Sequence, residues 1–414
     1  MRRQLWRFAG TGKPSLHGTA VQTPGPHQYT NAQPSSEPGL ASAGARSDAA
    51  WHWFGRALEG ARVYGLMRGE STMRIAILTG GGDCPGLNAV IRAVVRKANR
   101  SYSSEVVGYL EGWRGPVENM VMPLTVQSTS GLLQRGGTII RTSRTNPFKL
   151  ERGPERIMES MQKNRLDALI AVGGEDTCGV AHRMHSEHGL NVVCVPKTID
   201  NDLNATDFTF GFDTAVNIVA EAIDRLHTTA ESHNRVLVCE VMGRYAGWIA
   251  AYGGIAGGAD YILVPEKPII VRDVVASIKK RHARGRDYSI VVVAEGAKFE
   301  DSEVLKDAQL DQFGHVKLGG IGEQVAKVIE KETGYETRAT VLGHIQRGGS
   351  PTAFDRVLAT RFGIAATDLV HKKQFGRMVA LSGNKIIDVP VEAGVGELKT
   401  LDLGLYEIAE VFFG

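Results

Sequence analysis

The chain has 414 residues, of which 43% are hydrophobic and 22% are charged, and its formal net charge is +3 at neutral pH. This length is enough for two or three domains with a large core, and the composition is typical of a globular protein. We find no apolar run of about eighteen residues, which argues against a membrane-spanning helix. The 49 glycines show no G-X-Y period, which excludes collagen.

Basic residues are concentrated near the N-terminus. Residues 1–72 hold eight Lys or Arg and four Asp or Glu, which leaves 40 basic and 41 acidic residues among the remaining 342. The folded part therefore gives no sign of nucleic-acid binding. The cysteines lack CxxC spacing, which disfavours structural zinc, and their small number fits a reducing cytoplasm rather than a disulfide scaffold. They are Cys84, Cys178, Cys194 and Cys239.

The first 72 residues are excluded from the fold prediction. Residues 1–50 carry five prolines and no sustained period, so disorder is predicted there, and residues 51–66 could form one short amphipathic helix. No acidic residue precedes Glu37, a weak resemblance to a transit peptide. We prefer the interpretation that the true start lies later, because Met73 directly precedes the first predicted strand.

Strands and helices alternate from Met73 onward. The segment 74–78 (RIAIL) predicts a buried strand, TGGGDCPG at 79–86 a tight turn, and 87–100 a helix with apolar residues at helical spacing. Strand, glycine turn and helix form the opening unit of a doubly wound sheet. Further strands are predicted at 166–174, 191–196, 235–243, 261–265, 288–296 and 339–343. Further helices are predicted at 177–189, 214–233, 247–256, 271–284, 320–332 and 352–372.

This order predicts an α/β fold. Alternating strands and helices favour mostly parallel sheets, and there are too many strands for one comfortable sheet. We therefore expect two Rossmann-like, three-layer α/β/α domains with the active site in the cleft between them. The larger is expected to comprise residues 73–211 and about 346–395, and the smaller residues 212–345 and about 396–414.

The turn at 79–86 has neither the GxGxxG spacing of a dinucleotide site nor the GK[ST] of a P-loop. Its small residues lie between a strand end and a helix N-terminus, where backbone amides and the helix dipole favour a phosphate. An ordinary tight turn explains the same residues equally well.

A second glycine turn, VGGEDTCG at 172–179, places Glu175 and Asp176 near a helix start, with Thr177 as a candidate N-cap. One interpretation is an acidic first turn that stabilises the helix dipole. The other is a Mg²⁺ carboxylate beside a phosphate site, since Mg²⁺ usually takes one or two protein carboxylates and leaves its other positions to water and phosphate.

The segment VPKTIDNDLNATD at 195–207 is the most informative. Lys197 and the two aspartates Asp200 and Asp202 follow a buried strand, at the carboxyl edge where doubly wound sheets bind ligands. This combination suits phosphoryl transfer, because a lysine can hold phosphate charge while an aspartate accepts a hydroxyl proton. The alternative is a polar loop with local ion pairs.

Arginines near predicted strand ends form a fourth group. Several of them on a nearly neutral domain favour binding of a small phosphorylated substrate, because guanidinium groups bind phosphate in a bidentate manner. Glu295, also near a strand end, could accept a hydrogen bond from a sugar hydroxyl or cap a helix. The basic members are Arg235, Arg244, Arg338, His344 and Arg347.

Taken in order, these motifs resemble the 6-phosphofructokinases. The segments are GGDCPGLNA, GGTIIRTSR, GGED, PKTIDND, ESHNR, EVMGR, AEG and ETRATVLGHIQRGGSP, and they span essentially residues 73–414. The resemblance implies transfer of a phosphoryl group to the 1-hydroxyl of fructose 6-phosphate, with Mg²⁺, in an early step of glycolysis. It also implies a homodimer or homotetramer with shared active sites, without a nucleic-acid or membrane partner.

The resemblance assigns roles residue by residue. Asp200 would be the general base, Thr198 and Asp202 would shape the transfer site, and Glu175 would bind the metal. Gly81 and Arg144 would line the donor side, and Arg235 and Arg338 would reach into a neighbouring subunit. The sugar phosphate would be held by Met242, Gly243, Arg244, Glu295, His344 and Arg347.

Two positions indicate the phosphoryl donor. ATP-using relatives commonly have glycine where this chain has Asp176 and Lys197, and the pair resembles that of the pyrophosphate-dependent branch. A carboxylate at Asp176 adds bulk and charge where a nucleotide α-phosphate would lie, and Lys197 adds a cation for a small polyanion. We therefore predict pyrophosphate as the donor in a reversible reaction. The alternatives are an ATP-dependent phosphofructokinase, an NAD or lipid kinase with a similar glycine turn, and a non-catalytic sugar-phosphate sensor.

Overall fold

The computed structural model describes residues 72–300 and 320–414, which fall within one compact unit, Leu58–Gly414. The predictions for residues 1–71, including the helix at 51–66 and the later start, lie outside the described residues. Within the described ranges, no helix combines the length and the apolar character needed to cross a bilayer.

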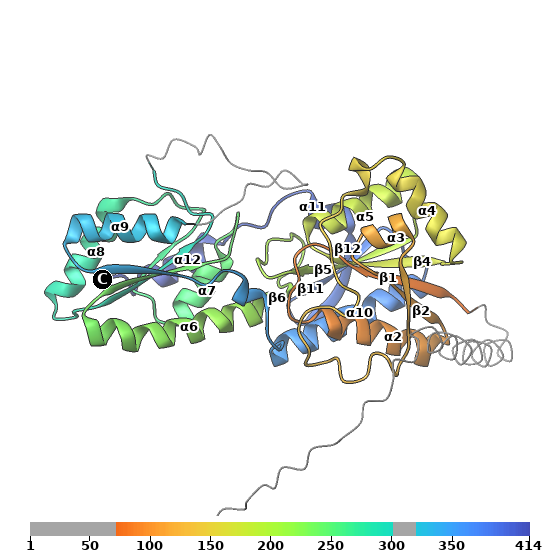
Figure 1. The fold of residues 1–414 in the computed structure, drawn as a ribbon, viewed down its shortest axis with the longest axis horizontal. Coiled ribbons are helices and arrows are strands. Elements are labelled where there is room, and N and C mark those ends of the chain that lie inside the picture. The colour runs from red at the N-terminus through yellow and green to blue at the C-terminus, as the bar shows by residue number, and fades with distance from the viewer. Residues whose placement is uncertain (1–71, 301–319) are drawn as a thin grey trace, which may run out of the picture. The chain divides into compact units, whose positions relative to one another are not determined.

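The strands of the described residues form two sheets (Figure 1). The larger contains β1 (Arg74–Thr79), β2 (Glu105–Tyr109), β3 (Val121–Leu124), β4 (Ala168–Gly173), β5 (Val192–Thr198), β6 (Phe210–Gly211), β11 (Arg377–Ser382) and β12 (Lys385–Pro390). The smaller contains β7 (Val236–Val241), β8 (Tyr261–Leu263), β9 (Ser289–Ala294) and β10 (Thr337–Val341).

Most neighbouring strands run parallel. The larger sheet has the order β12-β11-β5-β4-β1-β2-β3 with β6 beside β5, and the smaller has the order β10-β7-β9-β8. Of the named strands in the described residues, only the pairs β2–β3 and β11–β12 are antiparallel. The predicted α/β fold class with mostly parallel sheets is confirmed.

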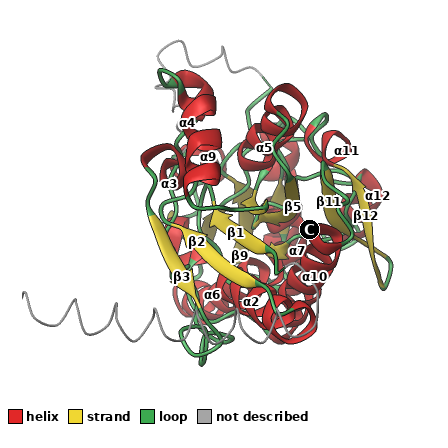
Figure 2. Cartoon of the chain, turned by 90° about the vertical axis from the view of Figure 1, so that its right-hand side faces the viewer, coloured by secondary structure: helices red, strands yellow, loops and turns green. Residues whose placement is uncertain are grey.

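Helices cover both faces of the larger sheet. Figure 2 shows α2 and α10 on one side of it and α3, α4 and α5 on the other. The helices that accompany the larger sheet are α2 (Leu87–Tyr102), α3 (Arg114–Glu118), α4 (Gly153–Lys163), α5 (Glu175–His188), α10 (Ala353–His371) and α11 (Val391–Val395). The other helices are α6 (Phe212–His233), α7 (Trp248–Ala256), α8 (Val271–Ala283), α9 (Ile321–Thr333) and α12 (Leu403–Glu410), with short 3₁₀ turns η1 (Pro147–Lys149) and η2 (Gly343–Arg347).

The alternation of side chains along each strand explains these layers. In β1, Ile75 and Ile77 pack into the core that α2 and α10 cover, whereas Ala76 and Leu78 pack into the core that α5 covers. Successive side chains of a strand point to opposite faces, so a strand with apolar residues throughout needs cover on both sides. In the smaller sheet β9 is likewise buried along its whole length.

Several predicted boundaries shift at the functional segments. β5 extends through Lys197 and Thr198, two residues beyond the predicted strand. The prediction of Thr177 as an N-cap is wrong, because α5 begins at Glu175 after Gly174. The predicted helix at 214–233 begins two residues earlier, at Phe212, after Gly211 with its φ of 98°, so Asp213 and Thr214 lie in the first turn of α6.

The prediction missed β2, β3, β6, β11, β12, α3, α4, α11 and α12. Two of these decide the chain path: β11 pairs with β5 and returns the chain to the larger sheet, and α12 packs on the smaller one. The Tyr406 hydroxyl of α12 donates to the Ile262 carbonyl of β8 at 2.8 Å. The division into a donor-binding and a sugar-binding domain stays a prediction.

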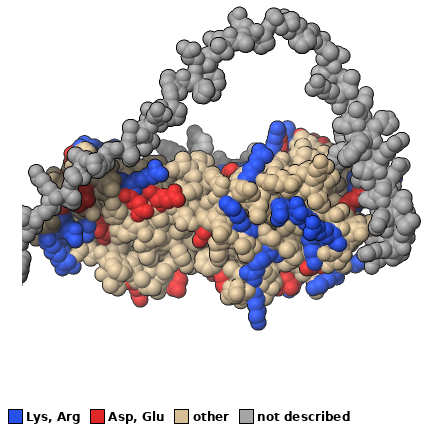
Figure 3. Space-filling model, turned by 90° about the horizontal axis from the view of Figure 1, so that it is seen from below, with Lys and Arg blue, Asp and Glu red and all other residues tan. Residues whose placement is uncertain are grey.

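Basic side chains are unevenly distributed on the surface. Figure 3 shows one face on which Lys and Arg gather toward one side while Asp and Glu are fewer and scattered. On α2, burial and then the charges of Arg96 and Arg100 lower the pKa of Arg92. The nearly neutral balance of residues 73–414 thus includes a locally basic helix.

Candidate active site

The glycine turn after β1 is fixed against a distant segment of the chain. Gly81 has a φ of 76°, which favours glycine, and its amide donates to the Ser143 carbonyl at 3.1 Å. The Thr142 hydroxyl donates to the Gly81 carbonyl at 2.6 Å. The next residue in that segment is Arg144, whose side chain is exposed. The predicted donor-side residues Gly81 and Arg144 therefore lie in adjoining segments.

Lys197 points into this turn. Its side chain is buried, and its Nζ donates to the Gly82 carbonyl at 2.6 Å. A Cβ added to Gly81 would lie 3.5 Å from the same Nζ. Burial lowers the pKa of Lys197, and Arg347 adds to that effect, whereas Cys84 and Asp200 oppose it. The Lys197 ammonium is therefore buried against the glycine turn and is not exposed at the surface.

Arg347 approaches the turn from the other sheet. It is the last residue of η2, which follows β10, and its Nη1 lies 3.5 Å from the Asp83 carbonyl. A Cβ added to Gly82 would lie 2.7 Å from Nη1. A larger residue at position 82 would therefore require the Arg347 guanidinium to shift. Lys197 and Arg347 thus bring two cations to Gly82, which suits an anionic ligand.

The loop after β5 is held by Asn201. This buried residue adopts a left-handed conformation at φ 52°, its Oδ1 accepts from the Thr209 amide at 3.1 Å, and its Nδ2 donates to the Asp207 carbonyl at 3.4 Å. Its neighbours Asp200 and Asp202 are thereby fixed on either side of a tight bend.

Asp200 presents an unsatisfied acceptor. Its amide donates to the Thr198 hydroxyl at 3.0 Å, but its buried Oδ1 has no hydrogen-bond partner in the described part of the chain. A buried carboxylate oxygen without a partner costs free energy unless a ligand supplies a donor. The position therefore suits a group that accepts a proton from a bound hydroxyl.

Three carboxylates influence one another at this loop. Burial, and then the charges of Asp200 and Glu175, raise the pKa of Asp202 to about 7, although the Thr198 hydroxyl opposes the rise. Carboxylates that disfavour each other's ionisation attract a proton or a cation. The two predicted catalytic aspartates and the predicted metal ligand thus belong to one electrostatic group.

The predicted sugar-phosphate residues lie at the carboxyl edge of the smaller sheet. Met242, Gly243 and Arg244 follow β7, and Glu295 follows the neighbouring strand β9. Gly243 has a φ of 132°, and its carbonyl accepts from the Gly296 amide at 3.2 Å, which ties the two loops together.

Charge connects this edge to the aspartate loop. Burial and then the charge of Asp200 raise the pKa of Glu295, whereas Arg244 and Arg347 lower it. The pKa of Glu295 therefore depends on the charges of both the predicted base and the predicted phosphate-binding arginines. His344 lies on η2 with an exposed side chain.

Arg235 and Arg338 are not brought to this group of residues. Arg235 precedes β7 and Arg338 is the second residue of β10, so both lie at the amino edge of the smaller sheet. They share Glu336, whose Oε1 lies 2.8 Å from Arg235 Nη2 and 2.7 Å from Arg338 Nη2. Both residues do lie at strand ends, as predicted, and their assignment to the site of a neighbouring subunit stays a prediction.

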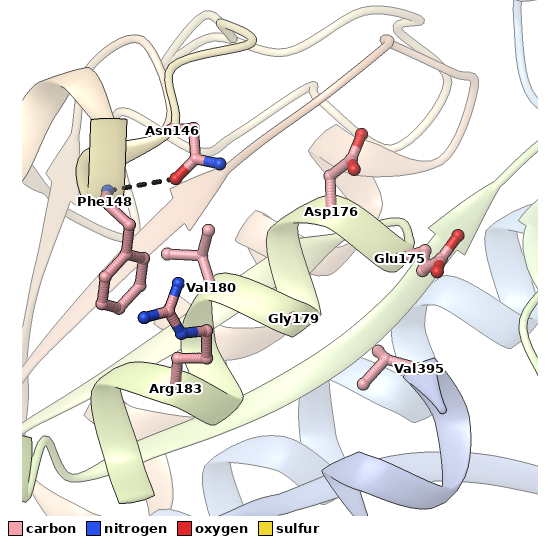
Figure 4. Close-up of a pocket in the computed structure, with 8 residues that line it drawn as sticks. All are labelled: Asn146, Phe148, Glu175, Asp176, Gly179, Val180, Arg183 and Val395. Atoms are coloured by element: carbon pink, nitrogen blue, oxygen red, sulfur yellow. Dashed lines mark hydrogen bonds between the residues drawn. The ribbon is translucent and has the colours of Figure 1, made fainter. Parts of the chain in front are cut away.

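Asp176 borders a pocket of about 220 Å³ beside the start of α5. Figure 4 shows Glu175 and Asp176 with carboxylates that point away from the Phe148 ring, and Arg183 next to that ring. The Arg183 guanidinium lies 3.6 Å from the ring centroid and donates to both carboxylate oxygens of Glu187, at 2.8 and 3.1 Å. The pocket's arginine is thus already paired with a carboxylate.

Two buried residues near the site escaped the sequence prediction. Gln346 accepts from the Met242 amide at 3.2 Å and donates to the Gly343 carbonyl at 3.1 Å, so it fixes the start of the sugar-phosphate segment. The carboxylate of Asp355 in α10 accepts from the amide and the hydroxyl of Thr214 at the start of α6. No local pattern marks either residue, because each accepts a hydrogen bond from a backbone amide more than 100 residues away.

Asp355 gives a testable dependence of stability on pH. Burial raises its pKa to about 6 from an ordinary value of 3.8, although the Thr214 hydroxyl and nearby amides lower it. The folded state thus holds this proton more tightly than the unfolded state, so the free energy of unfolding falls as the pH rises from about 4 to about 6. Asp355→Asn removes this dependence.

We expect the stability of Asp355→Asn, relative to the wild type, to increase between pH 4.5 and 7 by on the order of 2 kcal/mol. Urea unfolding of both proteins at several pH values measures the difference. If the new amide at position 355 is poorly paired, the free energy of unfolding of the variant falls by the same amount at every pH, which leaves the pH dependence of the difference unchanged. A difference that does not change with pH would contradict the assignment.

Comparison with known proteins shows the family. The phosphofructokinase family profile matches residues 74–370. The chain belongs to the phosphofructokinase family. The predicted enzyme class is thereby confirmed, and the match argues against the NAD-kinase and lipid-kinase alternatives.

Individual relatives cover the same part of the chain. A Streptomyces coelicolor protein named pyrophosphate–fructose 6-phosphate 1-phosphotransferase is 58% identical over 343 residues, 83% of this chain and 100% of the relative. A Mycobacterium leprae protein named ATP-dependent 6-phosphofructokinase is 51% identical over 344 residues, with the same two shares. The solved pyrophosphate-dependent phosphofructokinase from Nitrosospira multiformis has a TM-score of 0.71 at 22% identity and covers 83% of this chain and 93% of that one, which supports the fold.

Proposed function

We propose that this phosphofructokinase transfers a phosphoryl group from pyrophosphate to the 1-hydroxyl of D-fructose 6-phosphate. The products are fructose 1,6-bisphosphate and phosphate, and the reaction serves glycolysis and gluconeogenesis. The observation that carries the proposal is the buried ammonium of Lys197 in the glycine turn, at the end of the strand that leads to the unpartnered Asp200 carboxylate.

Three features favour pyrophosphate over a nucleotide. A nucleotide phosphate next to Asp176 would meet a like charge, which costs about 4 kcal/mol at a few ångströms and intermediate dielectric. The pocket beyond it, about 220 Å³, is smaller than the roughly 300–1,000 Å³ of usual ligand sites. Arg183 in that pocket is already paired with Glu187, whereas Lys197 lies deep in the turn, where a bare diphosphate reaches it.

The chain's own residues perform the transfer through position and charge. Asp200 accepts the proton of the 1-hydroxyl as the oxygen attacks, while Thr198 and Asp202 shape the transfer site. Lys197 and Arg347 neutralise the transferring group and the leaving phosphate. Gly81 and Arg144 line the donor side. The sugar phosphate is held by Met242, Gly243, Arg244, Glu295, His344 and Arg347. Without a nucleotide product, the step stays near balance and runs in both directions.

Mg²⁺ fits the acidic side of the site. The pKa of Asp202 is raised partly by Asp200 and Glu175, a repulsion that a divalent cation relieves. In the described residues no three Asp, Glu, His or Cys side chains form a metal cluster by themselves, which suits an ion that takes most of its ligands from water and phosphate. Glu175 would hold it, and the bound ion would neutralise charge on the donor oxygens.

Arg235 and Arg338 suggest an oligomer. Both guanidinium groups lie at the amino edge of the smaller sheet, around Glu336, rather than beside Asp200. We assign them to the sugar-phosphate site of a neighbouring subunit, which makes the enzyme a homodimer or homotetramer with shared sites. A cytoplasmic location is consistent with glycolysis and with four buried, free cysteines in the described residues.

The donor is tested by measuring fructose 6-phosphate turnover with pyrophosphate and with ATP at equal concentrations. We expect pyrophosphate to support turnover, in both directions, and ATP to be at least about 100-fold less efficient, since about 4 kcal/mol of repulsion corresponds to a larger factor. ATP is the alternative donor to test, because one relative of this chain is named an ATP-dependent 6-phosphofructokinase. Turnover with ATP and none with pyrophosphate would overturn the donor assignment but not the phosphoryl acceptor.

A further inference from the structure

A segment near the C-terminus lies across the loop that carries the catalytic aspartates. We define the C-terminal strap as residues 394–401, which comprise the last two residues of α11 and most of the segment that leads to α12. The Asn204 amide donates to the Gly394 carbonyl at 3.3 Å, and Leu203 forms an isolated antiparallel bridge with Leu398. The Lys399 amide donates to the carbonyl of Asp202 at 3.0 Å. The strap thus contacts the loop directly at a proposed catalytic residue.

The side chain of Lys399 holds the next part of the same loop. Its Nζ donates to the Thr206 carbonyl at 2.9 Å and to the Asp207 carbonyl at 2.6 Å. Together with the backbone hydrogen bond to Asp202, these contacts hold both ends of a six-residue stretch, 202–207. Hydrogen bonds from an ammonium group are stronger than those of a neutral donor. A single residue therefore fixes much of the loop backbone.

The strap is itself fixed to the smaller sheet's helices. The Trp248 Nε1, at the start of α7, donates to the Lys399 carbonyl at 3.1 Å, and Lys399 Nζ lies 5.0 Å from the Trp248 ring centroid. Two residues on, the Leu401 amide donates to Glu266 at 2.8 Å, and Glu266 also accepts from the Gly247 amide. Lys399 thus joins the aspartate loop to the segment that follows Met242, Gly243 and Arg244.

We propose that Lys399 is a positioning residue for phosphoryl transfer. Its ammonium holds the carbonyls of Thr206 and Asp207 so that the loop presents the Asp200 carboxylate to the 1-hydroxyl of the sugar. The proposal rests on the proposed function. It gives Lys399 no contact with substrate, so its removal acts on kcat rather than on binding, because a misplaced base lowers the rate of the bound complex.

The charge of Lys399 gives the proposal a pH signature. Burial lowers the pKa of Lys399 to about 8, and the charges of Asp207 and Asp202 oppose that shift. Asp202 and Asp207 are the charged groups that face the Lys399 ammonium from the loop. A third carboxylate, Glu266, accepts from the Leu401 amide at the end of the strap. Above about pH 8 the ammonium loses its proton, so its hydrogen bonds to the carbonyls of Thr206 and Asp207 weaken. We therefore expect kcat to fall in this pH range. Arginine keeps its charge throughout this range.

The test compares Lys399→Met and Lys399→Arg with Lys267→Met as a matched control. Lys267 also stacks on an aromatic ring, 4.4 Å from the Tyr406 centroid, and pairs with Glu410, but it does not touch the aspartate loop. We expect Lys399→Met to lower kcat about 10- to 100-fold with KM for fructose 6-phosphate within about threefold. Lys399→Arg should recover most of kcat and move the alkaline limb upward by at least about one pH unit.

Hydrogen exchange of the unliganded proteins provides a readout independent of turnover. Amides 201–209 should exchange faster in Lys399→Met than in Lys267→Met, while the helices keep wild-type exchange. If the wild type uses ATP instead of pyrophosphate, the same kcat comparison is made with ATP. Unchanged kcat and exchange in Lys399→Met, or an alkaline limb that arginine does not move, would overturn the proposal.

Discussion

Asp200→Asn is expected to lower kcat by about 10²- to 10⁴-fold, the usual contribution of a general base. The substitution preserves the size of the side chain, and Thr198 Oγ1, which accepts from the residue 200 amide, still fixes the backbone. What is lost is the basicity of the carboxylate, whose unpartnered Oδ1 would take the hydroxyl proton, because a carboxamide does not accept a proton in this pH range. Fructose 6-phosphate binding is expected to stay within about threefold, because the phosphate-binding arginines are unaffected.

Steady-state kinetics in both directions and calorimetric titration of fructose 6-phosphate measure the two effects separately. Asp224→Asn is the matched control, since Asp224 is an exposed carboxylate of α6 away from the loop. It should behave as the wild type. Turnover preserved in Asp200→Asn would remove Asp200 from the role of base, and loss of binding would make it a substrate-binding residue instead.

Removal of the Lys197 charge is expected to reduce kcat/KM for pyrophosphate by about 10- to 100-fold, since hydrogen bonds to charged groups contribute roughly 1.5–3 kcal/mol. The ammonium is buried against the Gly82 carbonyl, so no water-exposed cation can replace it. Lys197→Met keeps most of the side-chain volume, so its effect on kcat/KM reports the loss of the charge rather than the creation of a cavity. Lys197→Gly with Asp176→Gly removes both donor-selective side chains.

The double variant should lose pyrophosphate use and gain measurable turnover with ATP, because the carboxylate opposite a nucleotide phosphate is gone. Competition kinetics with the two donors measures the ratio of their kcat/KM values. Lys372→Met serves as the control for loss of one lysine, because Lys372 is exposed and directly follows α10. Pyrophosphate kinetics that stay unchanged in Lys197→Met would remove the physical reason for the donor assignment.

Local patterns predicted the elements that depend on neighbours in sequence. The unit 74–100 was predictable because an apolar run, a glycine turn and a helical period occur in succession, and β1 and α2 follow that order. The positions of Lys197 and Asp200 at a carboxyl strand edge followed from the buried run before them. Short or partly exposed elements, such as β12 and α12, carry too weak a period for this kind of prediction.

By itself the sequence determined the α/β class and the family, and it predicted the base and the cationic groups of the site, because these depend on residue type and short-range spacing. Only the tertiary structure decided which groups meet. Lys197 and Arg347 reach the same glycine turn, Arg235 lies elsewhere, and Lys399 grips the aspartate loop from the far end of the chain. Such contacts depend on the path of the backbone through two sheets, and the spacing of apolar residues along the sequence does not predict that path.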